Sequence, residues 1–192
     1  MGQVVLKPKM TGDEYLAWEA EQTEKHDFVN GEVYAMAGAE RGHVTTSLNM
    51  AMSLRQHLAG SPCRTYIADM KVQAQQGDQY FYPDVVVTCS TADRSSPLVV
   101  REPTLIIEVL SPSTAAYDRG EKFAHYRSIA SLEEVAFIDI HSRRTDVLRR
   151  SAGGLWVLHP FNAGDDVTLV SVKLTMTAAA MFAEVDEDDA PV

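Results

Sequence analysis

The sequence predicts an α/β (α+β) domain in which a mixed β-sheet is flanked by helices. The first reason is the order of the segments, which reads as helix, strands, helix and strand. The second is Thr104–Leu110, which is apolar at nearly every position, as is typical of a central strand buried on both faces. The third is the region after residue 144, where strand-like runs are separated by Gly-rich or polar turns.

Capping and turn signals define the N-terminal elements. Thr11 and Glu14 are the ends of a capping box, which marks the start of a helix. Asn30-Gly31 is a strong signal for the type I′ turn of a hairpin. An apolar stripe that ends at Leu58 indicates a longer helix. The elements expected here are a helix over 11–21, a hairpin over 26–36 and a helix over 40–58.

Runs rich in β-branched and aromatic residues predict most of the remaining elements. Strands are expected at 64–67, 70–74, 80–88, 104–110, 135–140, 144–149, 155–161 and 167–172, and helices at 114–129 and 177–184. Because no internal repeat or linker divides the chain, residues 1–183 are expected to form a single domain. Residues 184–192 are rich in Asp and Glu and are expected to form a disordered acidic tail.

The composition narrows the function classes. A net charge of −10 argues against broad, non-specific DNA binding, which needs clustered Lys and Arg. A local basic patch could form from arginines that also fit a solvated hairpin face: Arg143, Arg144, Arg149 and Arg150. No segment has the length of a membrane span or the pattern of a signal peptide, so we expect a cytoplasmic protein without a membrane partner.

The two cysteines, Cys63 and Cys89, do not have the spacing of a metal site. Both lie in strand-like runs, so we expect small buried hydrophobic residues. A disulfide is not expected, because the inferred compartment is reducing.

Two acids interrupt otherwise apolar strands. Glu108 shares a strand face with Ile106 and Leu110, and Asp84 shares one with Val86. A buried carboxylate without a partner costs several kcal/mol, so such acids usually serve a purpose, often the binding of a divalent cation. If the two strands pair, the acids converge and a cation relieves their repulsion. Alternatively, they cap backbone amides or pair with arginine.

The motifs around these acids resemble a known superfamily. They are Pro83-Asp84-Val85-Val86-Val87, then Ile107-Glu108-Val109-Leu110-Ser111-Pro112-Ser113-Thr114, then Asp118, Lys122 and Tyr126 at four-residue steps. The chain resembles the PD-(D/E)xK nucleases and, within them, the Uma-two family of restriction-endonuclease-like proteins, from about Thr11 to Arg150. The resemblance implies a restriction-endonuclease-like core and metal-dependent hydrolysis of DNA.

The resemblance also implies roles for three residues. Asp84 and Glu108 would hold Mg²⁺ or Mn²⁺. The superfamily usually carries a lysine two residues after the second acid, but this chain has Leu110 there. Lys122 is the replacement that the resemblance supports, as the cation that stabilises charge on phosphate. Otherwise it forms a surface i,i+4 pair with Asp118.

Four further residues are expected to be auxiliary. Asp118 and Tyr126 share a helix face with Lys122 and would form a wall of the site, although ordinary packing also explains Tyr126. By resemblance, Glu32 is a further acid and His43 a phosphate or water contact. A histidine near a helix start is also commonly a surface or capping residue.

The sequence thus predicts a Mg²⁺- or Mn²⁺-dependent endonuclease that acts on DNA, and the alternative is a nuclease-like binding or regulatory module without catalysis. The net charge of −10 favours the alternative, and so does Leu110, which puts an uncharged residue at the usual lysine position. A metal-free hydrolase with two carboxylates has no aromatic, cleft-like surroundings to support it. Gly-x-Ser-x-Gly, His-Glu-x-x-His and a Gly-rich phosphate loop are absent from the sequence. We also expect a homodimer, with the strands between Arg144 and Val172 as an interface.

Overall fold

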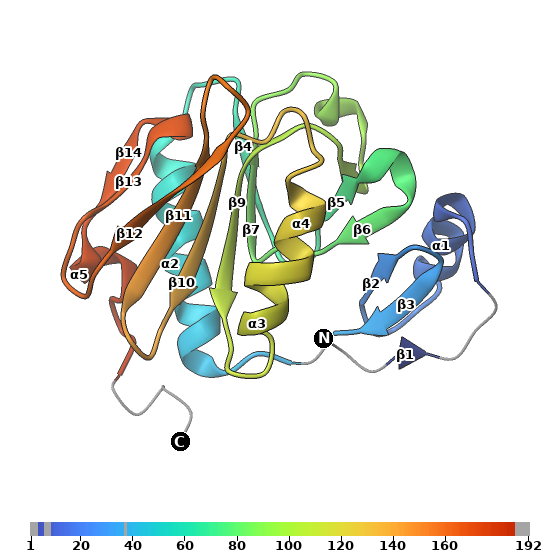
Figure 1. Cartoon of the computed structure of the whole chain (residues 1–192), viewed down its shortest axis with the longest axis horizontal. Coiled ribbons are helices and arrows are strands. Elements are labelled where there is room, and N and C mark those ends of the chain that lie inside the picture. Colours follow the sequence, from blue (N-terminus) through green and yellow to red (C-terminus); the bar gives the residue numbers. More distant parts are fainter. Residues whose placement is uncertain (1–3, 6–8, 37, 187–192) are drawn as a thin grey trace.

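The computed structural model describes residues 4–5, 9–36 and 38–186, which form two six-stranded sheets, a two-stranded sheet and the helices that cover them (Figure 1). The strands of the first large sheet, in spatial order, are β12 (Trp156–Phe161), β11 (Arg144–Arg150), β10 (Glu134–Asp139), β9 (Pro103–Leu110), β7 (Val85–Thr88) and β4 (Arg64–Ile67). Those of the second are β1 (Val4–Val5), β3 (Glu32–Ala35), β2 (His26–Val29), β6 (Gln79–Phe81), β5 (Lys71–Ala74) and β8 (Val99–Val100).

The first sheet is the centre of the fold and is covered on both faces. Helix α2 (Arg41–His57) packs on one face, with the two-stranded sheet β13 (Val167–Leu169) and β14 (Leu174–Met176) and helix α5 (Ala178–Met181). Helices α3 (Ala115–Tyr117) and α4 (Phe123–Tyr126) cover the other face (Figure 1). Strands β9 and β10 are parallel, and the other pairs are antiparallel. The expected α/β fold with a mixed sheet flanked by helices is confirmed.

The second sheet carries helix α1 (Gly12–Glu19) at its outer side (Figure 1). The predicted capping box forms between Thr11 and Glu14, since each side chain bonds the backbone amide of the other residue. The predicted hairpin turn also forms, with positive φ angles of 51° at Asn30 and 91° at Gly31. Both local signals therefore gave the correct element.

One predicted strand, 80–88, is in fact two strands in different sheets. Strand β6 ends at Phe81 and β7 begins at Val85, and Tyr82-Pro83-Asp84 crosses between the sheets. Pro83 explains the break, because proline has no N–H to donate to a strand ladder. Asp84 consequently lies at the joint between the two large sheets.

The predicted helix over 114–129 is also interrupted. A π-helical turn, Asp118–Lys122, separates α3 from α4. Such a turn inserts one extra residue into a helix and is often found at functional sites. Periodicity cannot reveal it, because the apolar spacing on both sides remains helical.

Cys63 and Cys89 form a disulfide, so the prediction of two unpaired thiols is wrong. Arg64 pairs with Thr88 in the β4–β7 ladder, which places the two cysteines opposite each other one step further along. Their Cα atoms are 3.9 Å apart. The register of two distant strands creates this proximity, and an argument from the compartment could not anticipate it. The pair secures the edge strand β4 to the sheet.

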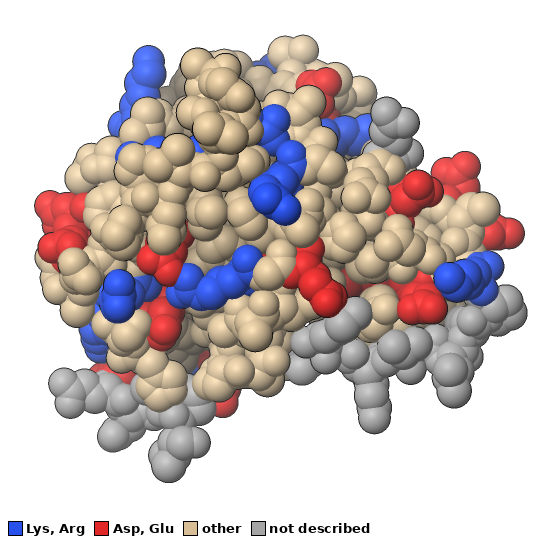
Figure 2. Space-filling model, viewed as in Figure 1, with Lys and Arg blue, Asp and Glu red and all other residues tan. Residues whose placement is uncertain are grey.

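The arginines considered as a basic patch mostly serve the fold. Arg149 donates from Nε to a buried Glu134 carboxylate at 2.7 Å, and Arg150 donates to the backbone carbonyls of Arg127, Ile129 and Ala130. On the face in Figure 2, Lys and Arg are interspersed with Asp and Glu, and no large basic patch is visible there.

The chain still packs against the core just after residue 183. Val185 is buried in the core on the α2 side, and its carbonyl accepts a hydrogen bond from Arg143. Residues 187–192 of the expected acidic tail lie outside the described residues. The helices within the described part of the chain are too short or too polar to cross a membrane.

Candidate active site

Asp84 and Glu108 lie side by side at the ends of two paired strands. Val85 pairs with Ile107 in the antiparallel β7–β9 ladder, so the next residues in register are Asp84 and Glu108. Directly opposite residues project their side chains from the same face, with Cβ atoms about 5 Å apart. Asp84 also accepts a hydrogen bond of 2.7 Å from the backbone N–H of Val109 to Oδ2. The register therefore places the two acids opposite each other, and the amide capping considered as the alternative also occurs.

Glu108 is buried on the face of the sheet covered by α3 and α4. The ammonium of Lys122 lies 2.8 Å from its Oε1, and the hydroxyl of Tyr126 donates to the same oxygen at 2.5 Å. The side chains of Glu108 and Lys122 are only 5% and 7% exposed. Tyr126 therefore does more than pack, because it also fixes the orientation of the carboxylate.

Lys122 reaches Glu108 from the last position of the π turn. Its Nζ is also 3.7 Å from Oδ1 of Asp118, which is buried as well. The pair between Asp118 and Lys122 exists, but it is not the solvated helix-surface pair that the sequence allowed. Helix α3 follows soon after the end of β9, and this short connection brings Lys122 to Glu108 (Figure 1).

His43 contacts the other acid. It lies in the first turn of α2, and its Nε2 is 2.8 Å from Oδ1 of Asp84. The two side chains are 18% and 22% exposed, so this end of the site is open to water while the Glu108 end is closed. The structure places His43 beside Asp84, in keeping with its expected auxiliary position.

Glu32 is not brought to the site. Its exposed side chain lies on β3 and accepts a hydrogen bond from Tyr34. Asp27, on the neighbouring strand β2, is an acid of the second sheet that interacts electrostatically with Lys122. It accepts a hydrogen bond from the backbone N–H of Tyr82, two residues before Asp84. Sequence reasoning missed Asp27, although an acid directly before Phe28-Val29 in a short strand was a usable signal.

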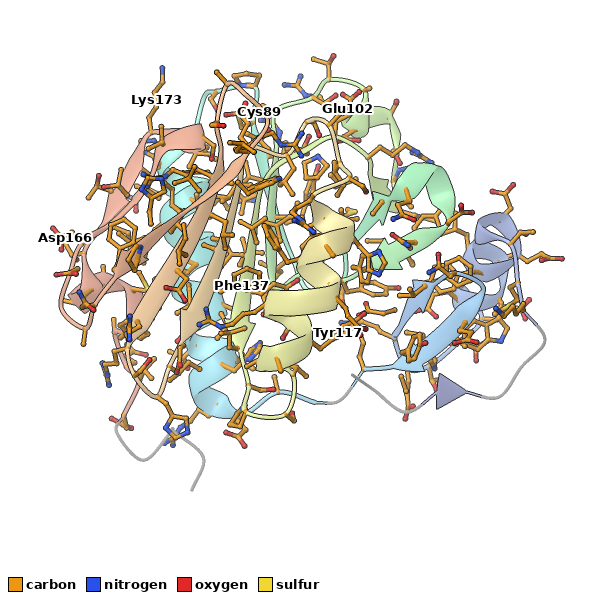
Figure 3. All side chains as sticks on the ribbon, in the orientation of Figure 1. Cys89, Glu102, Tyr117, Phe137, Asp166 and Lys173 are labelled. Carbon is orange, nitrogen blue, oxygen red and sulfur yellow. A yellow bond between two sulfur atoms is a disulfide. The ribbon has the colours of Figure 1, made fainter. Side chains whose placement is uncertain are left out.

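The site contains more buried acids than bases. Burial raises the pKa of Glu108 to about 8, and the charges of Asp118 and Asp84 add to the rise while Lys122 opposes it. Burial also raises the pKa of Asp27, again against the attraction of Lys122. Tyr117, which is labelled in Figure 3 beside α3, has a raised pKa because of burial and the nearby charge of Asp27. The single ammonium of Lys122 does not balance the negative charge that these carboxylates would carry together.

The donor set fits a small divalent cation that keeps most of its water. Among the residues that the structure describes, no group of three or more His, Cys, Asp and Glu side chains could enclose a metal ion. Mg²⁺ commonly binds through one or two carboxylates and retains several waters. Asp84 and Glu108 supply two adjacent carboxylates, which is the ligand type that Mg²⁺ and Mn²⁺ prefer.

Comparison with known proteins agrees with the motifs and the fold. The family model described as "Uma2: Putative restriction endonuclease" matches residues 13–180. The chain belongs to the Uma2 family. The motifs of Asp84, Glu108 and Lys122 resemble this same Uma2 (Uma-two) family, and the match covers most of the chain.

Relatives of the Uma2 chain occur in cyanobacteria. Two uncharacterized proteins of Synechocystis are 35% and 33% identical to it over 175 and 151 residues, which cover 91% and 78% of this chain and 92% and 85% of theirs. A crystal structure described as a putative nuclease belonging to DUF820, from Anabaena variabilis, superposes with a TM-score of 0.76 at 17% identity. It covers 91% of this chain and 98% of its own, and at this identity it shows that the fold is shared.

Proposed function

We propose that this Uma2 chain is a Mg²⁺- or Mn²⁺-dependent endonuclease that hydrolyses phosphodiester bonds in DNA. The contact between Lys122 and Glu108 carries the proposal. Leu110 leaves the usual lysine position of the superfamily without charge, and Lys122 supplies an ammonium 2.8 Å from the acid that precedes it. Membership of a family described as "Putative restriction endonuclease" supports the same reaction class.

Asp84 and Glu108 would hold the cation. The chemistry that a bound Mg²⁺ or Mn²⁺ supplies is polarisation of a phosphoryl oxygen and activation of a water nucleophile. The closed end of the site at Glu108 keeps bulk water away, which strengthens electrostatic interactions there.

The remaining residues act by position and charge. Lys122 would stabilise the negative charge that develops on phosphate, or orient the attacking water. Tyr126 holds Glu108 in a single orientation through its hydroxyl. His43, at the open end, would contact phosphate or water while it keeps Asp84 in place.

The second candidate is a nuclease-like module that binds without cutting. It is favoured by the satisfied state of the two acids, since Asp84 already bonds His43 and Val109, and Glu108 already bonds Lys122 and Tyr126. The net charge of −10 also favours it, because such a chain gains little from general attraction to DNA.

Cleavage of plasmid, linear duplex and single-stranded DNA with Mn²⁺, and with EDTA in its place, tests the proposal. We expect wild-type cleavage only with metal, and a loss of about 10²-fold or more in Lys122→Ala, the scale for removal of one charge-stabilising donor. Lys173→Ala is the matched control, because this exposed lysine lies far from Tyr117 and the site (Figure 3). If the wild type cuts none of these DNAs, the binding module is correct. If Lys122→Ala cuts as well as the wild type, Lys122 is only a structural partner of Glu108.

A further inference from the structure

The outer side of helix α2 carries an apolar stripe that the fold leaves uncovered. Val44, Leu48 and Met52 follow one another at four-residue steps and therefore share a helix face. Their exposed fractions are 53%, 49% and 61%. Ile67 of the adjacent strand β4 is 50% exposed. Together these four residues define the α2–β4 surface, where large apolar side chains gather instead of occurring singly.

The α2–β4 surface is concave as well as apolar. A hollow of about 430 Å³ lies between the helix and the strand, and its walls include Leu48, Met52, Tyr66 and Met70. Two charged residues, Arg55 and Asp69, stand at its margin. An apolar hollow with a charged rim has the composition of a protein–protein contact, whose apolar centre is surrounded by polar residues.

The strand beside the hollow is the last one of the central sheet. Strand β4 pairs with β7 on one side, and within the described residues its other side has no strand partner. Such an edge presents unpaired N–H and C=O groups to any strand that can align with it. A partner that supplies both a strand edge and an apolar helix face would satisfy the whole surface.

The opposite charges of Arg55 and Asp69 on the rim favour a second copy of this chain as that partner. Helix α2 and strand β4 run in opposite directions, since a short turn at 58–63 connects them. Arg55, near the end of α2, is therefore beside the start of β4, and Asp69 follows its end. Arg55 makes no ion pair or hydrogen bond with the residues that the structure describes. Asp69 pairs with Lys25 of its own chain, but its side chain is 81% exposed and its carboxylate can accept a second cation. A twofold rotation about the middle of β4 would bring Arg55 of one molecule to Asp69 of the other, twice.

We propose that the α2–β4 surface is the interface of a homodimer, in which two β4 strands pair antiparallel and two α2 helices pack side by side. Helix α2 has 17 residues and is therefore about 25 Å long, which is long enough for two copies to pack side by side over several turns. The twofold axis is perpendicular to the joined sheet, which keeps both Glu108 sites on one face of a twelve-stranded sheet. This arrangement does not depend on nuclease activity.

A rival surface exists at the opposite edge of the sheet. Strand β12 and the residue before it expose Leu155, Val157 and Leu158 at 72%, 45% and 53%. This edge belongs to the C-terminal strands that the sequence suggested for dimer contacts. The α2–β4 surface is the better candidate because it combines a hollow of about 430 Å³ with the opposite charges of Arg55 and Asp69.

Sedimentation velocity of the full chain at about 1–50 μM tests the interface, a range set by micromolar affinities. We expect a wild-type dimer, a monomer for Met52→Glu and a dimer for Leu158→Glu. The two variants place the same charge on similarly exposed apolar residues, which makes the second a matched control. Ile67→Lys, on β4, should also give a monomer, and far-UV circular dichroism checks that each variant is folded.

A charge exchange tests the geometry. The Arg55→Glu variant and the Asp69→Arg variant, each measured by itself, should be monomers, because each substitution creates two like-charge contacts across the twofold axis. A mixture of the two variants should form a heterodimer, in which both contacts again join opposite charges. A monomeric wild type at 50 μM would overturn the proposal, and so would a dimer that Leu158→Glu dissociates and Met52→Glu does not. Failure of the mixed variants to associate would refute the twofold arrangement.

Discussion

Glu108 is the residue on which the chemistry of the site depends. A buried ion pair contributes little net stability, because the cost of removing two charges from water offsets their attraction. The pair between Glu108 and Lys122 is therefore poorly explained as a device for stability. A neighbouring carboxylate at Asp84 and a hydroxyl at Tyr126 make better sense as parts of a reactive site.

The raised pKa of Glu108 predicts how stability depends on pH. Its pKa is 4.5 ordinarily and about 8 in the folded, metal-free protein, so the folded state binds this proton more tightly. The part of the unfolding free energy that this bound proton contributes is fully present below pH 4.5 and is lost as the pH rises through 8. Glu108→Gln, which is neutral throughout, should therefore lose less stability than the wild type between about pH 5 and pH 8.

Urea unfolding with EDTA at several pH values measures this difference. Glu133→Gln, at an exposed position of the next strand connection, is the control and should follow the wild-type curve. A loss of several kcal/mol in Glu108→Gln near pH 6 would contradict the expectation and identify a structural salt bridge, the usual result of breaking a buried pair.

Sequence motifs gave most residues of the site but not their surroundings. Asp84, Glu108, Asp118, Lys122 and Tyr126 were singled out by the resemblance to the family motifs, and strand alternation and four-residue helical steps agreed with it because both are local properties. Asp27 was missed because its approach to Lys122 depends on how the second sheet meets the first.

At the scale of elements, the disulfide between Cys63 and Cys89 predicts a measurable stabilisation. It joins the edge strand β4 to β7 across a separation of 26 residues. Closing a loop of this size removes unfolded-state entropy worth about 3.5 kcal/mol. The double variant Cys63→Ser/Cys89→Ser should lose about this much unfolding free energy in urea. The wild type in reductant should lose a similar amount, whereas an unchanged midpoint in reductant would mean that the bond does not stabilise the fold.

The elements show why local signals succeed in some places and fail in others. The strand at 64–67 and the hairpin at Asn30-Gly31 were predicted correctly, since β-branched runs and turn residues act over a few positions. The π turn at 118–122 and the split at Pro83 were not. Both depend on packing against the sheets, which decides where a helix widens and which sheet a strand joins.

At the scale of the molecule, the site lies where the two large sheets meet. Tyr82-Pro83-Asp84 crosses from one sheet to the other, and Asp27 approaches from the second sheet. The central sheet supplies Glu108, and the covering helices supply His43 and Lys122. The site is therefore a product of several elements, and its residues from Asp27 to Tyr126 all lie within the family match over residues 13–180.

The most direct test of a metal-dependent site is a crystal soaked in Mn²⁺ and measured for anomalous scattering. The account predicts one strong peak shared by the carboxylates of Asp84 and Glu108, which disappears in isomorphous crystals of Glu108→Ala. A wild-type crystal with no peak there, and with Lys122 still bonded to Glu108, would contradict it.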